Sequence, residues 1–221
     1  MRKVHPLVAA LCASLSAVPS FAAPGPPASL FVVVGADGTL ARGSSAKIGH
    51  GGTGNYLVDF PVNIPGCTFI ASVGTADKTQ PSAGTITLAP GAGNKNVVFV
   101  STFDGSGNAA DQPFHLVVNC ASEARNPEVA GAIDAGGNVV RSLGISGASH
   151  PDTGVYEVNT DISDASSACA TPATIGAAGT TVPLPGMVSV AQGTTTSDIE
   201  VYTFDVAGNP ADRPFQLYVE C

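Results

Sequence analysis

The stretch VSTFDGSGNAADQPFHLVVNC, residues 100–120, returns as VYTFDVAGNPADRPFQLYVEC, residues 201–221. Aligned without a gap over residues 97–120 and 198–221, the two copies are identical at 13 of 24 positions. Such self-similarity indicates that a whole structural unit has been duplicated. The duplication predicts two domains, residues 29–120 and 129–221, joined by a polar linker over residues 121–128.

Shorter landmarks recur in the same order in both copies. TGNYLVDF (53–60) matches TGVYEVNT (153–160), and CTFIASVG (67–74) matches CATPATIG (169–176). Within the copies apolar residues alternate at period two between Gly, Pro, Asn and Asp, which is typical of short β-strands. In the first copy we expect about seven strands, with an eighth, closing strand at Leu116. Their centres are predicted near Val33, Leu40, Lys47, Val58, Phe69, Ile86 and Val100.

These strands predict an all-β fold: two tandem antiparallel β-sandwich domains, with immunoglobulin-like and jelly-roll-like topologies both compatible. Strong helical periodicity is absent. The closing motif is interpreted as a β-hairpin, in which residues 98–103 run in, residues 104–113 form the loop and residues 114–120 run out.

Residues 1–22 have the features of a cleaved secretory signal peptide. Arg2 and Lys3 precede an apolar stretch, and Ser20 and Ala22 provide small residues before the expected cleavage. A proline-rich lead follows over residues 23–28. No segment has roughly 20 consecutive apolar residues, so we expect a secreted or periplasmic protein without membrane insertion after cleavage.

Four cysteines remain after the signal, two in each copy at matching positions. An even count in an exported chain indicates disulfides, and four cysteines allow three pairings. If each copy is self-contained, the duplication selects Cys67–Cys120 and Cys169–Cys221. The cysteine that closes each copy is then expected to tether the last strand to an earlier one, and a tether across the two sheets is compatible with this pairing.

The chain carries 9 basic and 17 acidic residues, for a net charge of −8, and loss of the signal with its two basic residues makes the charge −10. This balance argues against a nucleic-acid partner. The partner class that is left is an unknown protein or surface ligand.

Oxygen donors are dense in the repeated loop, which makes it a candidate calcium site. The six candidates are Asp104, Asn108, Asp111, Asp205, Asn209 and Asp212. Their spacing is not that of a calcium loop with a closing Glu, and hydrogen bonds to loop amides explain the same residues. We therefore interpret the loop as structural and expect no metal and no cofactor.

Other repeated polar residues have equally plain interpretations. His50 and His150 are interpreted as loop histidines without a partner, and Arg42 and Arg141 as members of ion pairs rather than ligand contacts. Ser149, His150 and Asp152 have the residue types of a hydrolase triad, but neighbours on one loop do not line up as a triad does. No catalytic, metal or nucleotide motif occurs elsewhere.

The pattern GxYxVxF, a cysteine, then VxTxDxxGxxxDxPFxLxVxC occurs here as GNYLVDF, Cys67 and residues 100–120. It resembles repeats in uncharacterised exported bacterial proteins with tandem, cysteine-containing β-sandwich domains, although Thr160 replaces Phe60 in the second copy. The resemblance implies an exported β module and no site residues. The leading hypothesis is a secreted, non-enzymatic structural, binding or adhesion module, and the alternative is a secreted hydrolase with a dispersed active site.

Overall fold

The computed structural model describes residues 29–120 and 129–221, which contain sixteen strands and one short helix. The expected signal, lead and linker lie outside these residues. The strands of the first copy are β1 Ser29–Val34, β2 Leu40–Gly43, β3 Lys47–Gly52, β4 Asn55–Asp59, β5 Thr68–Val73, β6 Gly84–Pro90, β7 Val97–Asp104 and β8 Phe114–Asn119. Those of the second are β9 Val129–Ile133, β10 Val139–Leu143, β11 Ile145–Asp152, β12 Val155–Thr160, β13 Ala173–Ile175, β14 Met187–Gln192, β15 Asp198–Phe204 and β16 Phe215–Val219.

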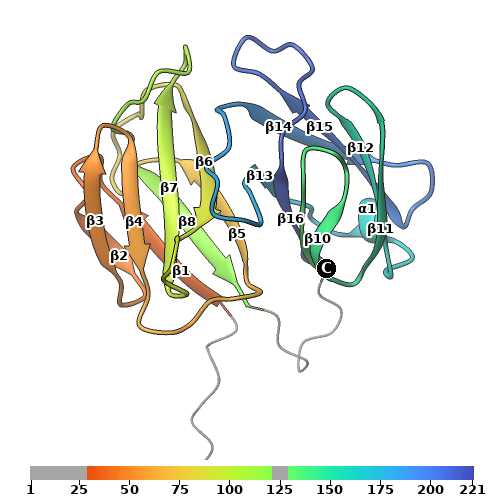
Figure 1. Ribbon diagram of the computed structural model, residues 1–221, viewed down its shortest axis with the longest axis horizontal. Coiled ribbons are helices and arrows are strands. Elements are labelled where there is room, and N and C mark those ends of the chain that lie inside the picture. Colours follow the sequence, from red (N-terminus) through yellow and green to blue (C-terminus); the bar gives the residue numbers. More distant parts are fainter. Residues whose placement is uncertain (1–28, 121–128) are drawn as a thin grey trace, which may run out of the picture.

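Each copy forms two four-stranded antiparallel sheets. The first copy has the strand orders β2-β1-β8-β5 and β3-β4-β7-β6, and the second has the corresponding orders β10-β9-β16-β13 and β11-β12-β15-β14. Figure 1 shows the two resulting sandwiches next to one another. The fold is therefore all-β, as predicted, and every strand centre expected in the first copy lies within a strand.

The alternating residues face the interior of each sandwich. Tyr56 and Val58 of β4, with Phe114 and Leu116 of β8, are 0% exposed, and their counterparts in the second copy include Tyr156 and Phe215. Two separate apolar cores result, one in each copy. Burial of each large apolar side chain contributes roughly 1.5–3 kcal/mol to stability. Burial of these alternating side chains therefore supplies most of the free energy that holds the two sheets together.

The closing motif is not a hairpin, which corrects the sequence interpretation. β7 lies in one sheet and β8 in the other, so residues 105–113 cross from sheet to sheet. Ala109 turns back to form a bridge with Phe103, and Ala110 N donates to Thr102 O at 3.1 Å. The connection is long enough to make this local turn and still cross, which leaves β7 and β8 each with two neighbours in its own sheet.

Both predicted disulfides are present, Cys67–Cys120 and Cys169–Cys221. Thr68 and Asn119 are paired residues of β5 and β8, so the first disulfide joins neighbouring strands at the end of one sheet. The tether therefore does not cross between the sheets. No helix within the described ranges is long and apolar enough to cross a membrane.

The second copy departs from the first around its first disulfide cysteine. A short helix, α1 (Ala165–Ala168), precedes Cys169, and β13 has only three residues where β5 has six. Pro172 occupies the position of Ile70, and proline has no N–H to donate to a sheet. This substitution explains why the β13 edge is shorter.

Candidate functional site

The first half of the repeated loop is a turn held by its own side chains. The Asp104 carboxylate accepts hydrogen bonds from Ser106 N at 2.8 Å and from Asn108 N at 2.9 Å. Asn108 Nδ2 also donates to Asp104 Oδ2 at 3.1 Å, and these bonds hold the pKa of Asp104 below its ordinary value. Asp205 and Asn209 repeat the arrangement.

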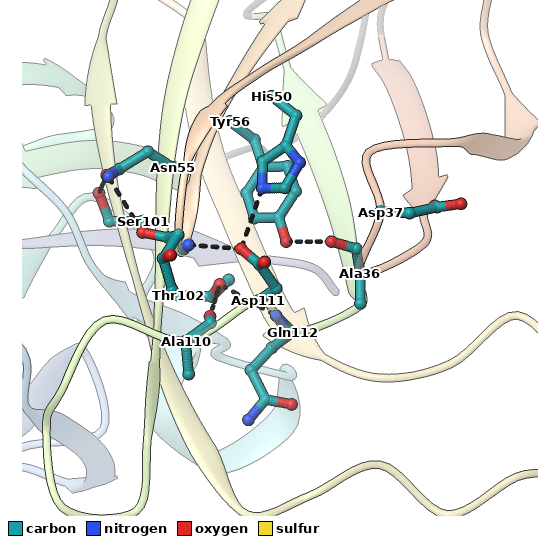
Figure 2. Close-up of polar contacts among 12 residues, drawn as sticks. Ala36, Asp37, His50, Asn55, Tyr56, Ser101, Thr102, Ala110, Asp111 and Gln112 are labelled. Atoms are coloured by element: carbon teal, nitrogen blue, oxygen red, sulfur yellow. Dashed lines mark hydrogen bonds and ion pairs between the residues drawn. The ribbon is translucent and has the colours of Figure 1, made fainter.

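The third acidic residue of the loop points to a different part of the domain. Asp111 Oδ1 accepts a hydrogen bond from Gly54 N at 2.6 Å and lies 2.9 Å from His50 Nε2 (Figure 2). The six calcium candidates are thus split in each copy between a turn and a separate cluster. Within residues 29–120 and 129–221 no group of three or more His, Cys, Asp or Glu side chains is placed to hold a metal ion.

His50 stacks on a buried tyrosine. Its ring centroid lies 4.7 Å from that of Tyr56 with an interplanar angle of 6°. Figure 2 shows the imidazole lying against the Tyr56 ring. Tyr56 Oη donates to Ala36 O at 2.7 Å, and the tyrosine ring meets Phe114 edge-on. Burial, with the nearby Asp111 charge, raises the pKa of Tyr56 to about 12. The ring is therefore neutral and serves as a fixed platform for the imidazole.

The second copy builds the same cluster. His150 Nε2 lies 3.0 Å from Asp212 Oδ1, and Gly154 N donates to that oxygen at 2.7 Å. His150 stacks on Tyr156 with centroids 4.6 Å apart. We call the set His50, Gly54, Tyr56 and Asp111, with its counterpart in the second copy, the histidine–aspartate cluster.

Sequence reasoning missed this cluster. The histidines lie on strands β3 and β11 rather than in loops, and each has an aspartate partner about sixty residues away. The signal was present in the duplication, because the histidine, the glycine and the aspartate recur together in both copies. Their recurrence indicates that these residues have a role in each domain. It does not show which of them are in contact.

The histidine–aspartate cluster joins three segments that are far apart in sequence. One carboxylate oxygen binds both the amide of the β3–β4 turn and the imidazole, so it ties these to the connection that crosses between the sheets. In the described part of the chain no hydroxyl or thiol hydrogen-bonds to His50 or His150. Asp152 instead accepts from its neighbour Thr153 N, so Ser149, His150 and Asp152 do not line up as a triad.

A second candidate site lies where the two sandwiches meet. Phe69 N of the edge strand β5 donates to Gln216 Oε1 at 2.7 Å, and Ala71 N donates to Thr174 Oγ1 at 3.0 Å. Ala177 N donates to Leu88 O on β6 at 2.9 Å. Side chains and backbone of the second copy thus form hydrogen bonds with backbone N–H and C=O groups of β5 and β6, which would otherwise be unpaired at the sheet edges of the first copy.

This contact makes the two copies unequal. The residues of β9 and β16 that face away from their own core are at most 8% exposed; they are Ala130, Ala132, Gln216 and Tyr218. In the first copy Phe31 and Val117 occupy the positions of Ala130 and Tyr218, and they are 51% and 38% exposed. The two other matching residues, Val33 and His115, are buried and half-buried, so the face that is covered in the second copy is open in the first only around Phe31 and Val117.

The edges show the opposite difference. Leu88 on β6 is fully buried, whereas its counterpart Val190 on β14 is 38% exposed. Along β14, Ser189–Gln192 is exposed, and the matching part of β6 is largely buried. The edge that is covered in the first copy is therefore open in the second.

The repeated arginines do not behave as predicted. Neither Arg42 nor Arg141 forms an ion pair within the described residues, where the only such pairs are those of the two histidines. Arg141 Nη2 instead donates to Gln216 Oε1 at 3.0 Å, and its guanidinium lies over the Phe69 ring, 5.7 Å from the centroid. Arg42 is exposed. Arg141 is therefore covered by the Gln216 amide of its own sandwich and by the Phe69 ring of the first sandwich, and not by a carboxylate.

The chain matches no protein-family model, no curated protein and no solved structure. Inference on its function therefore comes from its own residues and geometry.

Proposed function

We propose that the chain is a secreted, non-enzymatic module with a structural or binding role, and that its partner is a second copy of itself. The two disulfides support an oxidising compartment, either extracellular or periplasmic. The loop acids and histidines support a structural role, because they hydrogen-bond to one another and to loop amides.

The observation that carries this proposal is the unequal use of two matching surfaces. Within the chain, β16 packs on β5 of the first copy, while β13 and the residues that follow it meet both β5 and β6. Phe31 and Val117 on the matching face of the first copy, and Val190 on the matching edge of the second, are exposed. An open face and an open edge on one molecule make a head-to-tail contact between copies, which extends into a chain unless the rotation closes.

The chemistry of the open surfaces suits this contact. The open face presents large apolar side chains, Phe31 and Val117, where the covered face has Ala130 and Tyr218. The open edge presents Val190 on β14, the last strand of its sheet, whose outer backbone N–H and C=O groups have no neighbouring strand. This combination favours association with another chain. Both surfaces gain from leaving water, and burial of Phe31 and Val190 contributes roughly 1–3 kcal/mol each.

Sedimentation velocity over a concentration series tests the proposal. The mature protein is expected to form dimers and longer species, and Phe31→Ser is expected to reduce them strongly. Leu57→Ser is the matched control, because Leu57 is 42% exposed on the other sheet of the same domain and should leave association unchanged. Mature protein that stays monomeric at all concentrations, or equal loss in both variants, would refute the proposed partner.

A secreted hydrolase is the second candidate, since a carboxylate that orients an imidazole is one part of a hydrolytic site. The observation that favours it is the His50–Asp111 pair and its repeat. Turnover of activated esters that disappears in the His50→Ala, His150→Ala double variant would support this candidate. Absence of turnover, or turnover that survives in the double variant, would remove it.

A further inference from the structure

We propose that the pocket between the two sandwiches binds a small organic carboxylate through Arg141 and Lys95. This site is independent of the proposed self-association, because it lies within the contact between the two halves of one chain.

Arg141 carries a positive charge that the protein leaves uncompensated. Its Nη2 donates to the neutral amide of Gln216, while its Nε is buried and has no hydrogen-bond partner. The Phe69 ring covers one side of the guanidinium, and burial lowers the pKa of Arg141. A charge removed from water costs free energy unless a counter-ion or hydrogen bonds offset it.

The absence of a carboxylate beside Arg141 is unexpected in this composition. The chain has 17 acidic residues for 9 basic ones, and no carboxylate of the described residues lies within ion-pair distance of the guanidinium. An arginine fork suits a carboxylate geometrically, with two parallel hydrogen bonds. The unpaired charge of Arg141 therefore fits an anion supplied from outside.

The pocket next to Arg141 supplies a second cation and an apolar wall. Its volume is about 250 Å³, and both domains contribute to it. Lys95 lines it on the first domain, where its side chain is exposed and forms no ion pair within the described residues. Asn94 adds one polar side chain, and the apolar lining residues are Ile64, Pro65, Phe69, Pro90, Val97 and Ala178.

The size and the lining define the class of ligand. Pockets for drug-sized ligands begin at roughly 300 Å³, so this one accepts a smaller molecule. The apolar wall favours an acid with a compact hydrocarbon or aromatic part over inorganic phosphate. Binding there would contact both sandwiches at once and would stabilise their docked arrangement.

Thermal unfolding and titration calorimetry of the mature protein with benzoate test this site. Benzoate is expected to bind saturably and to raise the melting temperature, and inorganic phosphate at equal ionic strength is expected to do less. Arg141→Gln should weaken benzoate binding about tenfold or more, since it removes charge-assisted hydrogen bonds. The matched control is Arg42→Gln, which changes the corresponding, exposed arginine and should bind like the parent.

Lys95→Gln keeps the test decisive if Arg141→Gln does not fold, because Lys95 is exposed and its removal leaves the core intact. It should weaken benzoate binding several-fold at low salt. Three results would overturn the proposal: no saturable binding of benzoate, equal binding in the Arg141→Gln and Arg42→Gln variants, or unchanged affinity in Lys95→Gln.

Discussion

Asp111 is the side chain on which the histidine–aspartate cluster of the first domain depends. The Gly54 amide, followed by the His50 imidazole, holds the pKa of Asp111 below its ordinary value of 3.8. The unfolded chain binds this proton more readily, so ionised Asp111 stabilises the fold above about pH 4. That contribution is lost as the pH falls through the lowered pKa.

Asp111→Asn is therefore expected to lower stability at neutral pH and to flatten the pH dependence of unfolding between about pH 4 and pH 2. Urea unfolding at a series of pH values measures both effects. Asp161→Asn is the control, because the Asp161 carboxylate makes no hydrogen bond within the described residues. Parallel pH profiles for Asp111→Asn and the parent would show that the carboxylate does not hold the crossing connection.

Gly54 donates the other hydrogen bond to Asp111 and has a backbone that suits only glycine. Its φ is +71°, and a Cβ there would lie 2.3 Å from Thr102 O. Gly54→Ala should destabilise the protein by about 2 kcal/mol or more, from the strained backbone and the clash together. Gly51→Ala is the control, since nothing lies within 4 Å of a Cβ at that position. Similar melting temperatures for the two variants in calorimetry would contradict this account.

The strands themselves could be predicted, but the way they pair could not. The alternation that includes Tyr56 and Val58, or Phe114 and Leu116, identifies a strand with one buried face. Such a strand can bury its apolar side chains in the core from either sheet of the sandwich, so the alternation does not say which sheet it joins. The pattern of the closing motif therefore predicts a hairpin, although β7 and β8 belong to different sheets. The ten residues between Phe103 and Phe114 allow both arrangements, and the turn formed by Phe103 and Ala109 is not visible as a pattern.

The disulfides could be predicted because the duplication reduces three pairings to one. Cys67 and Cys120 join the ends of the neighbouring strands β5 and β8, and Cys169–Cys221 lies beside the isolated bridge between Ala170 and Glu220. Replacing this pair with serines should lower the free energy of unfolding by about 4 kcal/mol, mainly because the unfolded chain gains freedom. Chemical denaturation of the double variant measures the loss. A change under about 1 kcal/mol would mean that the sheet, rather than the bond, restricts the chain ends.

At the scale of the whole molecule, the differences between the copies carry more information than the identities. Gln216 replaces His115 and Ala130 replaces Phe31, and both changes fall on the face that the first sandwich covers. These substitutions were unremarkable in the sequence, because nothing there showed which face meets the other domain. The contacts of Arg141 with Gln216 and Phe69 depend on the same face and are likewise not visible in the sequence.

Gln216 is the centre of this contact, since it accepts from Phe69 N and Arg141 and donates to Ala177 O at 3.0 Å. Gln216→Leu leaves these groups unsatisfied and should cost about 2–3 kcal/mol of stability. His115→Leu, at the corresponding position of the first copy, removes one hydrogen-bond contact, to Thr75 O at 3.0 Å, and should cost less. Proteolysis and calorimetry would detect the loosened domains, and equal effects of the two variants would contradict the importance of this contact.

The most direct test of the head-to-tail module is sedimentation velocity of two variants, alone and mixed. Phe31→Ser disables the open face, and Val190→Lys places a charge on the open edge while its side chain can still reach solvent. Each variant alone should be monomeric. An equal mixture should form a dimer that grows no further, because one intact face meets one intact edge. A mixture that stays monomeric, or single variants that still assemble, would contradict the account.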